Sequence, residues 1–182
     1  MEKDAVAAGN SEIGGLVNTT EIRILICYIM SSIPEPVPGQ LLADVLHYEG
    51  LANYFEVSDA IAFLTEGGQL QIVDEKENTY TATASGKDVA QTLRSSLSVT
   101  VKERAYAAAL KMMVRYKNEK ETDICISHEG GHTFITCTAK DGDLPFMSVK
   151  LLVADEEQAQ FVKNKFLDSK NLYSKIMELI TK

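Results

Sequence analysis

Basic residues are scarce in the first half of this 182-residue sequence. Residues 1–96 contain five Lys and Arg and fourteen Asp and Glu, which gives a formal net charge of −9. Residues 97–182 contain thirteen Lys and Arg and twelve Asp and Glu. Proteins bind duplex DNA non-specifically through Lys and Arg, which displace counterions from the phosphates. The charge of the first half therefore argues against direct contact with DNA there.

Tryptophan is absent, and there are only four prolines and three cysteines. An odd number of cysteines without framework spacing excludes a disulfide scaffold and is typical of a reducing compartment. No apolar run approaches the roughly eighteen residues that a membrane-spanning helix needs. The N-terminus also lacks the basic flank and apolar core of a signal peptide. We therefore expect a cytoplasmic protein that makes no membrane contact.

The first half predicts a flexible arm over residues 1–17 and a domain over residues 18–96. This domain contains segments with apolar residues at helical spacing, which turn residues separate. It also contains two short segments in which apolar and polar residues alternate, as in a β-strand. The expected helices lie near 19–32, 38–49, 57–66 and 85–93, the strands at 70–73 and 79–83, and a turn at 51–55. Three helices, a β-hairpin and a fourth helix follow the order of a winged helix-turn-helix.

The second half, residues 97–182, predicts a separate domain after a break near Ser96. A long helix is followed by three antiparallel strands and by C-terminal helices that are interrupted near Ser169. The expected long helix spans about 101–118, and the strands lie at 122–127, 133–139 and 146–154. The predicted fold class is α+β: an N-terminal winged helix-turn-helix, then a helix, a three-stranded antiparallel sheet and covering helices.

Four local segments, together with this order of elements, resemble a known family. They are residues 21–30, the turn 53–55, the segment 80–86 after the hairpin, and residues 172–179. The chain resembles, over about residues 20–180, a functionally uncharacterised family of small bacterial proteins that are predicted to be winged-helix transcriptional regulators. The resemblance implies a winged-helix domain, an α+β second domain and a role in transcription. It brings no catalytic motif.

In a helix-turn-helix, the second helix of the pair enters the major groove. Here the predicted recognition helix has Val57, Ile61 and Leu64 facing inward. The outward positions are Ser58, Asp59, Ala62 and Glu66. The predicted wing tip consists of Asp74, Glu75, Lys76, Glu77 and Asn78. None of the outward helix residues is basic, so DNA is a candidate partner that the charge does not favour.

The main basic candidate lies in the second half of the chain. Arg104, Lys111 and Arg115 stand seven and four residues apart, which places them on one stripe of the long helix. The stripe is interpreted foremost as a solvated helix face. Contact with nucleic acid is a second interpretation, and contact with the acidic half of a partner subunit is a third.

Residues 128–132, His-Glu-Gly-Gly-His, match the H-E-x-x-H zinc motif. That motif requires a helix, because only a helix places histidines four residues apart on one face. The flanking residues predict strands, so Gly130-Gly131 is better explained as a hairpin turn. This turn pairs Glu129 with His132 and leaves the two histidines on opposite faces of the hairpin. We expect no metal site here.

The cysteines and the remaining motifs do not indicate catalysis. Cys27 and Cys137 are expected in the core, while Cys125 points the other way, and no neighbouring cation lowers a thiol pKa. A phosphate-binding glycine loop and a nucleophile elbow are both absent. The sequence therefore predicts a protein that is not an enzyme and that needs no cofactor.

Two principal hypotheses on function remain open. The first is a regulator-like winged-helix protein, and the second is a protein-interaction module that uses the winged helix as a docking surface. Sensing of a small ligand by the second domain is a third hypothesis. A homodimer is expected, because the Ala- and Met-rich long helix permits close approach of a second helix.

Overall fold

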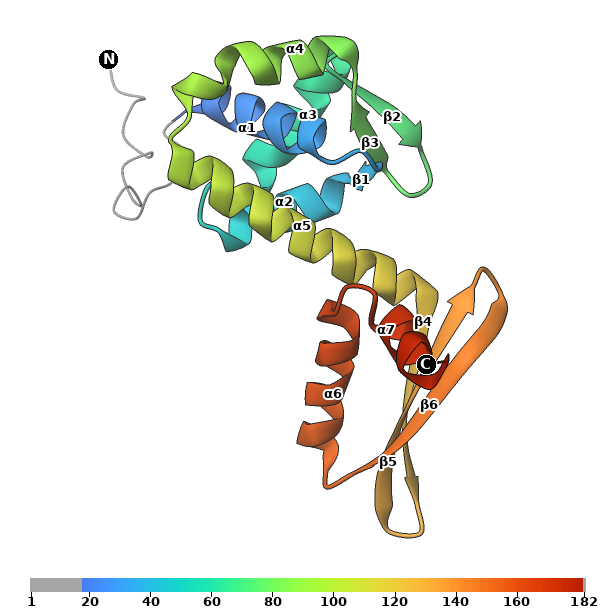
Figure 1. The fold of residues 1–182 in the computed structure, drawn as a ribbon. Helices are drawn as coiled ribbons and strands as arrows, with labels where there is room; N and C mark the ends of the chain where they lie inside the picture. Colours follow the sequence, from blue (N-terminus) through green and yellow to red (C-terminus); the bar gives the residue numbers. More distant parts are fainter. Residues whose placement is uncertain (1–17, 182) are drawn as a thin grey trace. The chain divides into compact units, whose positions relative to one another are not determined.

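The computed structural model describes residues 18–181 as a mixed α+β protein, so the predicted arm over residues 1–17 lies outside the described residues. The described residues form seven α-helices and two three-stranded antiparallel sheets (Figure 1). They divide into two compact units, and the division falls between Leu110 and Lys111, inside helix α5 (Val99–Glu121). None of the described helices combines the length and apolar character needed to cross a membrane.

The first unit contains four helices and a small sheet before α5 begins. The three strands of the sheet are arranged in the order β1-β3-β2. The elements are α1 (Thr19–Ser32), β1 (Val37–Pro38), α2 (Gly39–Tyr48), α3 (Tyr54–Glu66), β2 (Leu70–Asp74), β3 (Thr79–Ala82) and α4 (Ala84–Leu93). A single 3-10 turn, Arg94–Ser96, links α4 to the segment before α5.

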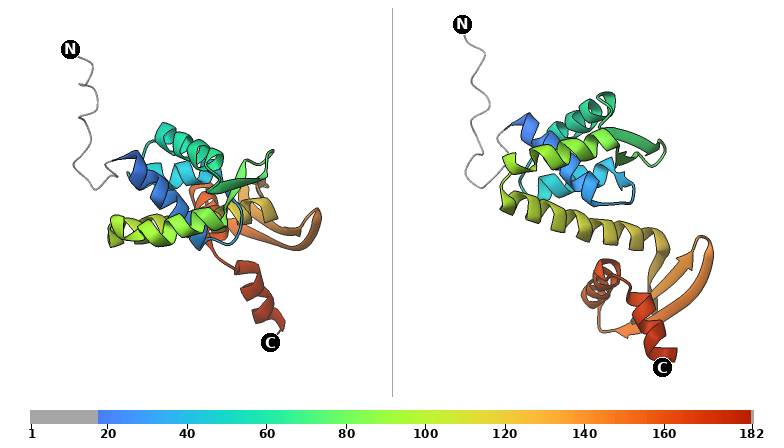
Figure 2. Two further views of the ribbon diagram at one scale, coloured as in Figure 1. Left: turned by 90° about the horizontal axis from the view of Figure 1, so that it is seen from above. Right: turned by 45° about the horizontal axis from the view of Figure 1, so that its top comes forward.

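Helix α1 is the centre of this unit. The Asn18 side chain caps it by accepting the Glu21 N–H at 2.9 Å. Leu25, Ile26 and Ile29 are completely buried, and α1 packs against α3 and α4. Each such side chain contributes roughly 1.5–3 kcal/mol of stabilisation. The arrangement around α1 can be followed in Figure 2.

The proline-rich link between α1 and α2 forms a short strand. Val37 pairs with Tyr80 and Pro38 with Thr79, so the extended conformation expected from the prolines becomes the edge strand β1. Proline is tolerated at an edge, because the backbone there has no ladder bond to lose on its outer side.

The second unit is a three-stranded meander covered by helices. Its strand order is β4-β5-β6. The elements after α5 are β4 (Thr122–Glu129), β5 (His132–Asp141), β6 (Leu144–Val153), α6 (Glu156–Asp168) and α7 (Leu172–Thr181). Ser169 ends α6 in extended backbone, which confirms the predicted break.

One face of this sheet holds the core of the second unit. Ile135 and Cys137 of β5 are completely buried, together with Ala159 of α6, and α6 packs on β5 and β6. On the opposite face, Lys150 contacts the Glu129 carboxylate at 2.9 Å. This ion pair holds the pKa of Glu129 below its usual value.

The expected domain boundary lies near Ser96, whereas the compact units divide at Leu110. The start of α5 belongs to the first unit because its side chains contact that unit. Tyr106 packs edge-on against Tyr28 of α1, with ring centroids 6.5 Å apart. Lys102 donates to the Arg94 carbonyl oxygen at 2.7 Å.

Gly86 in the first turn of α4 lies directly against the Gln69 carbonyl oxygen, where an added Cβ would collide with backbone. We predict that Gly86→Ala lowers the free energy of unfolding by about 1–2 kcal/mol, although alanine favours helix formation. Ser85→Ala on the same turn, where the side chain is exposed, is the control and changes stability by less than about 0.5 kcal/mol. Urea denaturation followed by circular dichroism measures both, and equal stabilities would contradict the steric explanation.

Candidate interaction surface of the first unit

The outward positions predicted for α3 are on the surface. Ser58, Asp59, Ala62 and Glu66 are all exposed, while the inward positions pack in the core. The four residues therefore share a helix face that a partner can reach. Two of the four are acidic, and none carries a positive charge.

The start of α3 differs from the prediction. The sequence predicts a turn over residues 51–55, but Tyr54 and Phe55 form the first turn of α3. Asn53 accepts the Glu56 N–H at 3.0 Å, and the Glu56 carboxylate accepts the Asn53 N–H at 2.8 Å. This reciprocal capping box extends the helix toward its N-terminus, and the Asn-x-x-Glu spacing is the sequence feature that could have predicted it.

The extension of α3 places two aromatic side chains on the surface. The Phe55 side chain is 77% exposed and the Tyr54 side chain 47% exposed. Their rings contact each other edge to face, with centroids 6.0 Å apart. Large exposed aromatics that lie together are typical of protein-interaction surfaces.

A shallow hollow of about 260 Å³ lies between the C-terminal half of α2 and the start of α3. We call it the α2–α3 hollow. Its lining residues are Ala43, Asp44, His47, Asn53, Tyr54 and Phe55. Gln40 fixes one wall, because it donates to the Asp44 carboxylate at 2.8 Å and accepts from the Tyr54 hydroxyl at 3.3 Å.

The two helices around the hollow carry a negative charge. Neither α2 nor α3 contains Lys or Arg, and their acids are Asp44, Glu56, Asp59 and Glu66. Arg23 of α1 lies against α3, but its guanidinium stacks on the Phe63 ring at 3.5 Å from the centroid. The positive charge of Arg23 is therefore engaged in a cation–π contact inside the unit.

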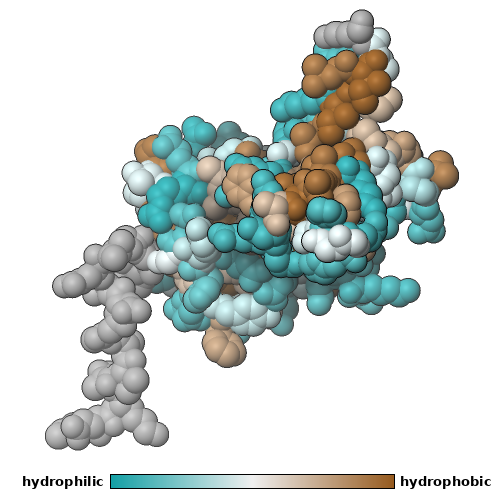
Figure 3. Space-filling model, turned by 90° about the horizontal axis from the view of Figure 1, so that it is seen from below, coloured by the Kyte–Doolittle hydropathy of each residue, from teal (hydrophilic) through white to brown (hydrophobic). Residues whose placement is uncertain are grey.

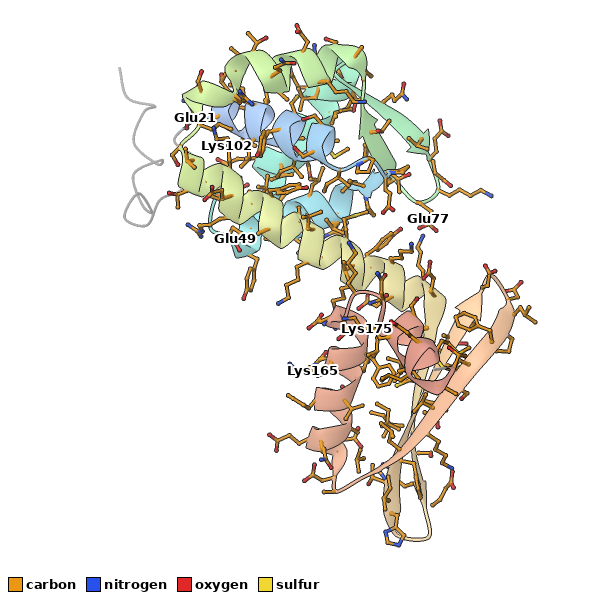
Figure 4. The ribbon with its side chains drawn as sticks, viewed as in Figure 1. Glu21, Glu49, Glu77, Lys102, Lys165 and Lys175 are labelled. Atoms are coloured by element: carbon orange, nitrogen blue, oxygen red, sulfur yellow. The ribbon has the colours of Figure 1, made fainter. Side chains whose placement is uncertain are left out.

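The predicted wing is also exposed. Asp74, Glu75, Lys76, Glu77 and Asn78 join β2 to β3, and Figure 4 labels Glu77 at this hairpin. The Asp74 carboxylate accepts the Lys76 and Glu77 N–H groups at 2.8 and 3.1 Å, which fixes the turn. The wing tip therefore presents three acids and one lysine.

The predicted basic stripe on α5 is divided between the units, and two of its three cations bind acids of their own unit. Arg104 contacts the Glu49 carboxylate at 3.0 Å and also donates to the Glu49 carbonyl oxygen, at the end of α2. Arg115 contacts Asp168 of α6 at 3.0 Å. Lys111 is exposed. The stripe therefore stays partly exposed to solvent, while its two arginines also link α2 and α6 to α5.

The H-E-x-x-H motif is a hairpin, as predicted. Gly130 and Gly131 have φ angles of +59° and +80°, which fit a two-residue turn between β4 and β5. Glu129 pairs with His132 and His128 with Thr133, so the histidines are on opposite faces. Among the described residues, no group of three or more His, Cys, Asp or Glu is placed to hold a metal ion.

The buried cysteines are protonated at neutral pH. Burial raises the pKa of the Cys27 and Cys137 thiols to about 11 each. Cys125 is exposed, and all three cysteines are free thiols. Because the thiolate is the nucleophile, a raised pKa removes Cys27 and Cys137 as reactive groups.

The comparisons with known proteins assign a family. Residues 22–180 match the family described as a domain of unknown function (DUF4364), and the chain belongs to this family. No curated protein and no solved structure matches the chain. The α2–α3 hollow and the acids around it are therefore the evidence on which a functional assignment depends.

The contact between Arg104 and Glu49 leads to a stability prediction. We predict that Arg104→Ala lowers the free energy of unfolding of the first unit by about 1 kcal/mol, because it removes an ion pair and a bond to a terminal helix carbonyl. Lys111→Ala removes the same charge from the same stripe and changes stability by less than about 0.5 kcal/mol. Thermal denaturation of both variants provides the measurement. Equal effects would show that the loss of positive charge, and not the α2 contact, determines stability.

Proposed function

We propose that the first unit is a winged helix that binds a basic, partly apolar segment of a protein partner instead of DNA. On this proposal, the chain is a non-catalytic regulatory adaptor of the cytoplasm. The observation that carries the proposal is the α2–α3 hollow with its exposed aromatic rings and acidic surroundings.

The order of elements supports a winged helix. α2 and α3 follow each other across a short turn, and the β2–β3 hairpin extends beside them as a wing would. The short strand β1 completes a three-stranded sheet with this hairpin. In such a fold, α3 and the wing form the surface that usually contacts the partner.

The side chains on this surface favour a protein over a nucleic acid. Phe55 and Tyr54 expose apolar surface. A protein segment can bury this surface, whereas the charged phosphate backbone of a nucleic acid does not. Aromatic side chains are enriched among the residues that dominate protein–protein affinity. An apolar side chain of the partner would fit the α2–α3 hollow.

The negative charge of this surface determines the sign of the charge that a partner must carry. Four acids on α2 and α3, with no Lys or Arg, attract a positively charged segment and repel a polyanion. Such complementarity increases the association rate and the specificity more than the affinity. The proposed partner is therefore a segment that combines Lys or Arg with at least one large apolar side chain.

A labelled peptide of alternating lysine and leucine tests this proposal by fluorescence anisotropy. We predict that the full chain binds this probe and that binding weakens as salt screens the acids. Phe55→Ala is expected to weaken binding about tenfold, because truncation of an interface aromatic commonly costs more than 1 kcal/mol. Circular dichroism verifies that the variant keeps its helices, as the exposure of Phe55 implies.

Phe161→Ala is the matched control for this experiment. Phe161 lies on α6 of the second unit and is 60% exposed, so the substitution removes the same ring from another surface. Unchanged binding by the control supports a specific site at the hollow. Absence of peptide binding at low salt, or an equal loss in both variants, would contradict the proposal.

A further inference from the structure

Strand β6 ends the sheet of the second unit on one side. The strand order is β4-β5-β6, and within the part of the chain that the structure describes β5 is the only strand that pairs with β6. Along such an edge, every second residue points its backbone N–H and C=O groups away from the sheet. An extended polypeptide can pair with these groups and continue the ladder. The edge of β6 is therefore a surface that fits another β-strand.

The sequence of β6 contains little of what usually protects an exposed edge. Natural sheets protect their edges with charged residues, prolines or very short strands. β6 is ten residues long, Lys150 is its one charged residue, and Pro145 stands only next to its start. β4, which forms the other edge, contains Asp123, His128 and Glu129. The two edges therefore differ, and β6 is the one suited to pairing.

The apolar face of the sheet also remains open beside β6. Ile135 of β5 is completely buried, whereas Leu151, its partner on β6, is 38% exposed. Cys137 of β5 is likewise completely buried, but its partner Val149 is only partly buried. The helix cover of this face thus ends before the sheet does. A strand added to β6 would extend the face and cover Leu151.

Helix α7 of the same unit also exposes apolar side chains, and Figure 3 shows the hydrophobic surface running along this helix to its end. Many kinds of apolar surface could cover a helix, because its backbone groups are bonded within the helix. The edge of β6 is more selective, because only an extended backbone satisfies its outward N–H and C=O groups. The occupant that fits this edge is therefore a strand.

The polarity pattern of β6 matches itself when the strand is read in the opposite direction. In an antiparallel pair, directly opposed residues lie on the same face, so a twofold axis must fall at a residue and not between two. An axis at Val149 places Ser148 opposite Lys150 of the second copy, and Met147 opposite Leu151. Polar residues then meet polar ones on the outer face, and apolar residues meet apolar ones on the core face. An axis at Lys150 would instead oppose two like charges.

The matching stretch is also regular. The pairing of β6 with β5 is continuous over residues 147–153, and the irregularity of the strand lies before Met147. A bulge inside the stretch would twist the edge away from a partner strand. Residues 147–151 therefore form a symmetric segment that can pair along its whole length.

We propose that β6 pairs antiparallel with β6 of a second copy of this chain, about a twofold axis at Val149, and joins the two sheets into one. Ala105 and Ala109 of the long helix, which the sequence indicates as a dimer contact, are already buried within the chain, so the proposed contact is a different one. The inference does not depend on the proposed function. If both hold, each dimer carries two α2–α3 hollows, and a partner with two basic segments binds with increased avidity.

Sedimentation velocity of the full chain at micromolar concentrations tests the dimer. The wild-type protein is expected at twice the chain mass of 20.0 kDa. Leu151→Lys is expected as a monomer with unchanged circular dichroism, because a lysine on the core face of an edge blocks strand pairing but can reach solvent within one copy. Leu144→Lys is the matched control: it makes the same change on the same strand, at a 69% exposed position outside residues 147–151, and it remains dimeric.

Charges at position 148 test the register, because this position faces Lys150 of the second copy twice across the axis. Ser148→Glu is expected to lower the dissociation constant of the dimer about fivefold, and Ser148→Lys to raise it about fivefold. This pair of variants decides the matter if Leu151→Lys does not fold. A monomeric wild-type protein would overturn the proposal and leave a strand of another protein as the candidate for this edge. A dimer that withstands Leu151→Lys, or equal effects of the two charges at position 148, would overturn it as well.

Discussion

The uneven distribution of charge along the chain constrains every interaction that the two units can make. α2 and α3 contain acids and no Lys or Arg, so the helix pair that would approach a nucleic acid repels phosphates. The second unit contains eleven Lys and Arg and eleven Asp and Glu, so its formal charges balance. Arg104 and Arg115 are bound to carboxylates of their own units and do not reverse this pattern. This distribution is the basis on which we propose a cationic partner for the first unit.

Interactions between residues that are close together in the sequence predict much of the fold. The Gly130-Gly131 turn sets the register of β4 and β5 down to the pairing of Ile124 with Cys137, because a two-residue turn leaves one alignment of its strands. Asn18 indicates the start of α1 because its side chain satisfies a free N–H of the first turn. These features depend on residues close together in sequence, and such interactions can be worked out without knowledge of the fold.

The features that define the candidate site depend on contacts between distant residues or on competition between local motifs. The aromatic character of Phe55 was visible in the sequence, but its exposure followed only once the Asn53–Glu56 capping box placed it in the first turn of α3. The ion pairs of Arg104 and Arg115 on the α5 stripe could not be predicted, because their partners Glu49 and Asp168 lie more than fifty residues away in the sequence. Helical spacing identifies a shared face but not what packs against it.

Titration of a fluorescently labelled mixed-sequence DNA duplex with the full chain tests the central claim most directly. The charge of α2 and α3 predicts no change in anisotropy at low salt, where electrostatic attraction to phosphates would be strongest. Binding at low salt that weakens steeply near physiological salt would contradict this account, because it would require a basic surface that α2 and α3 do not possess.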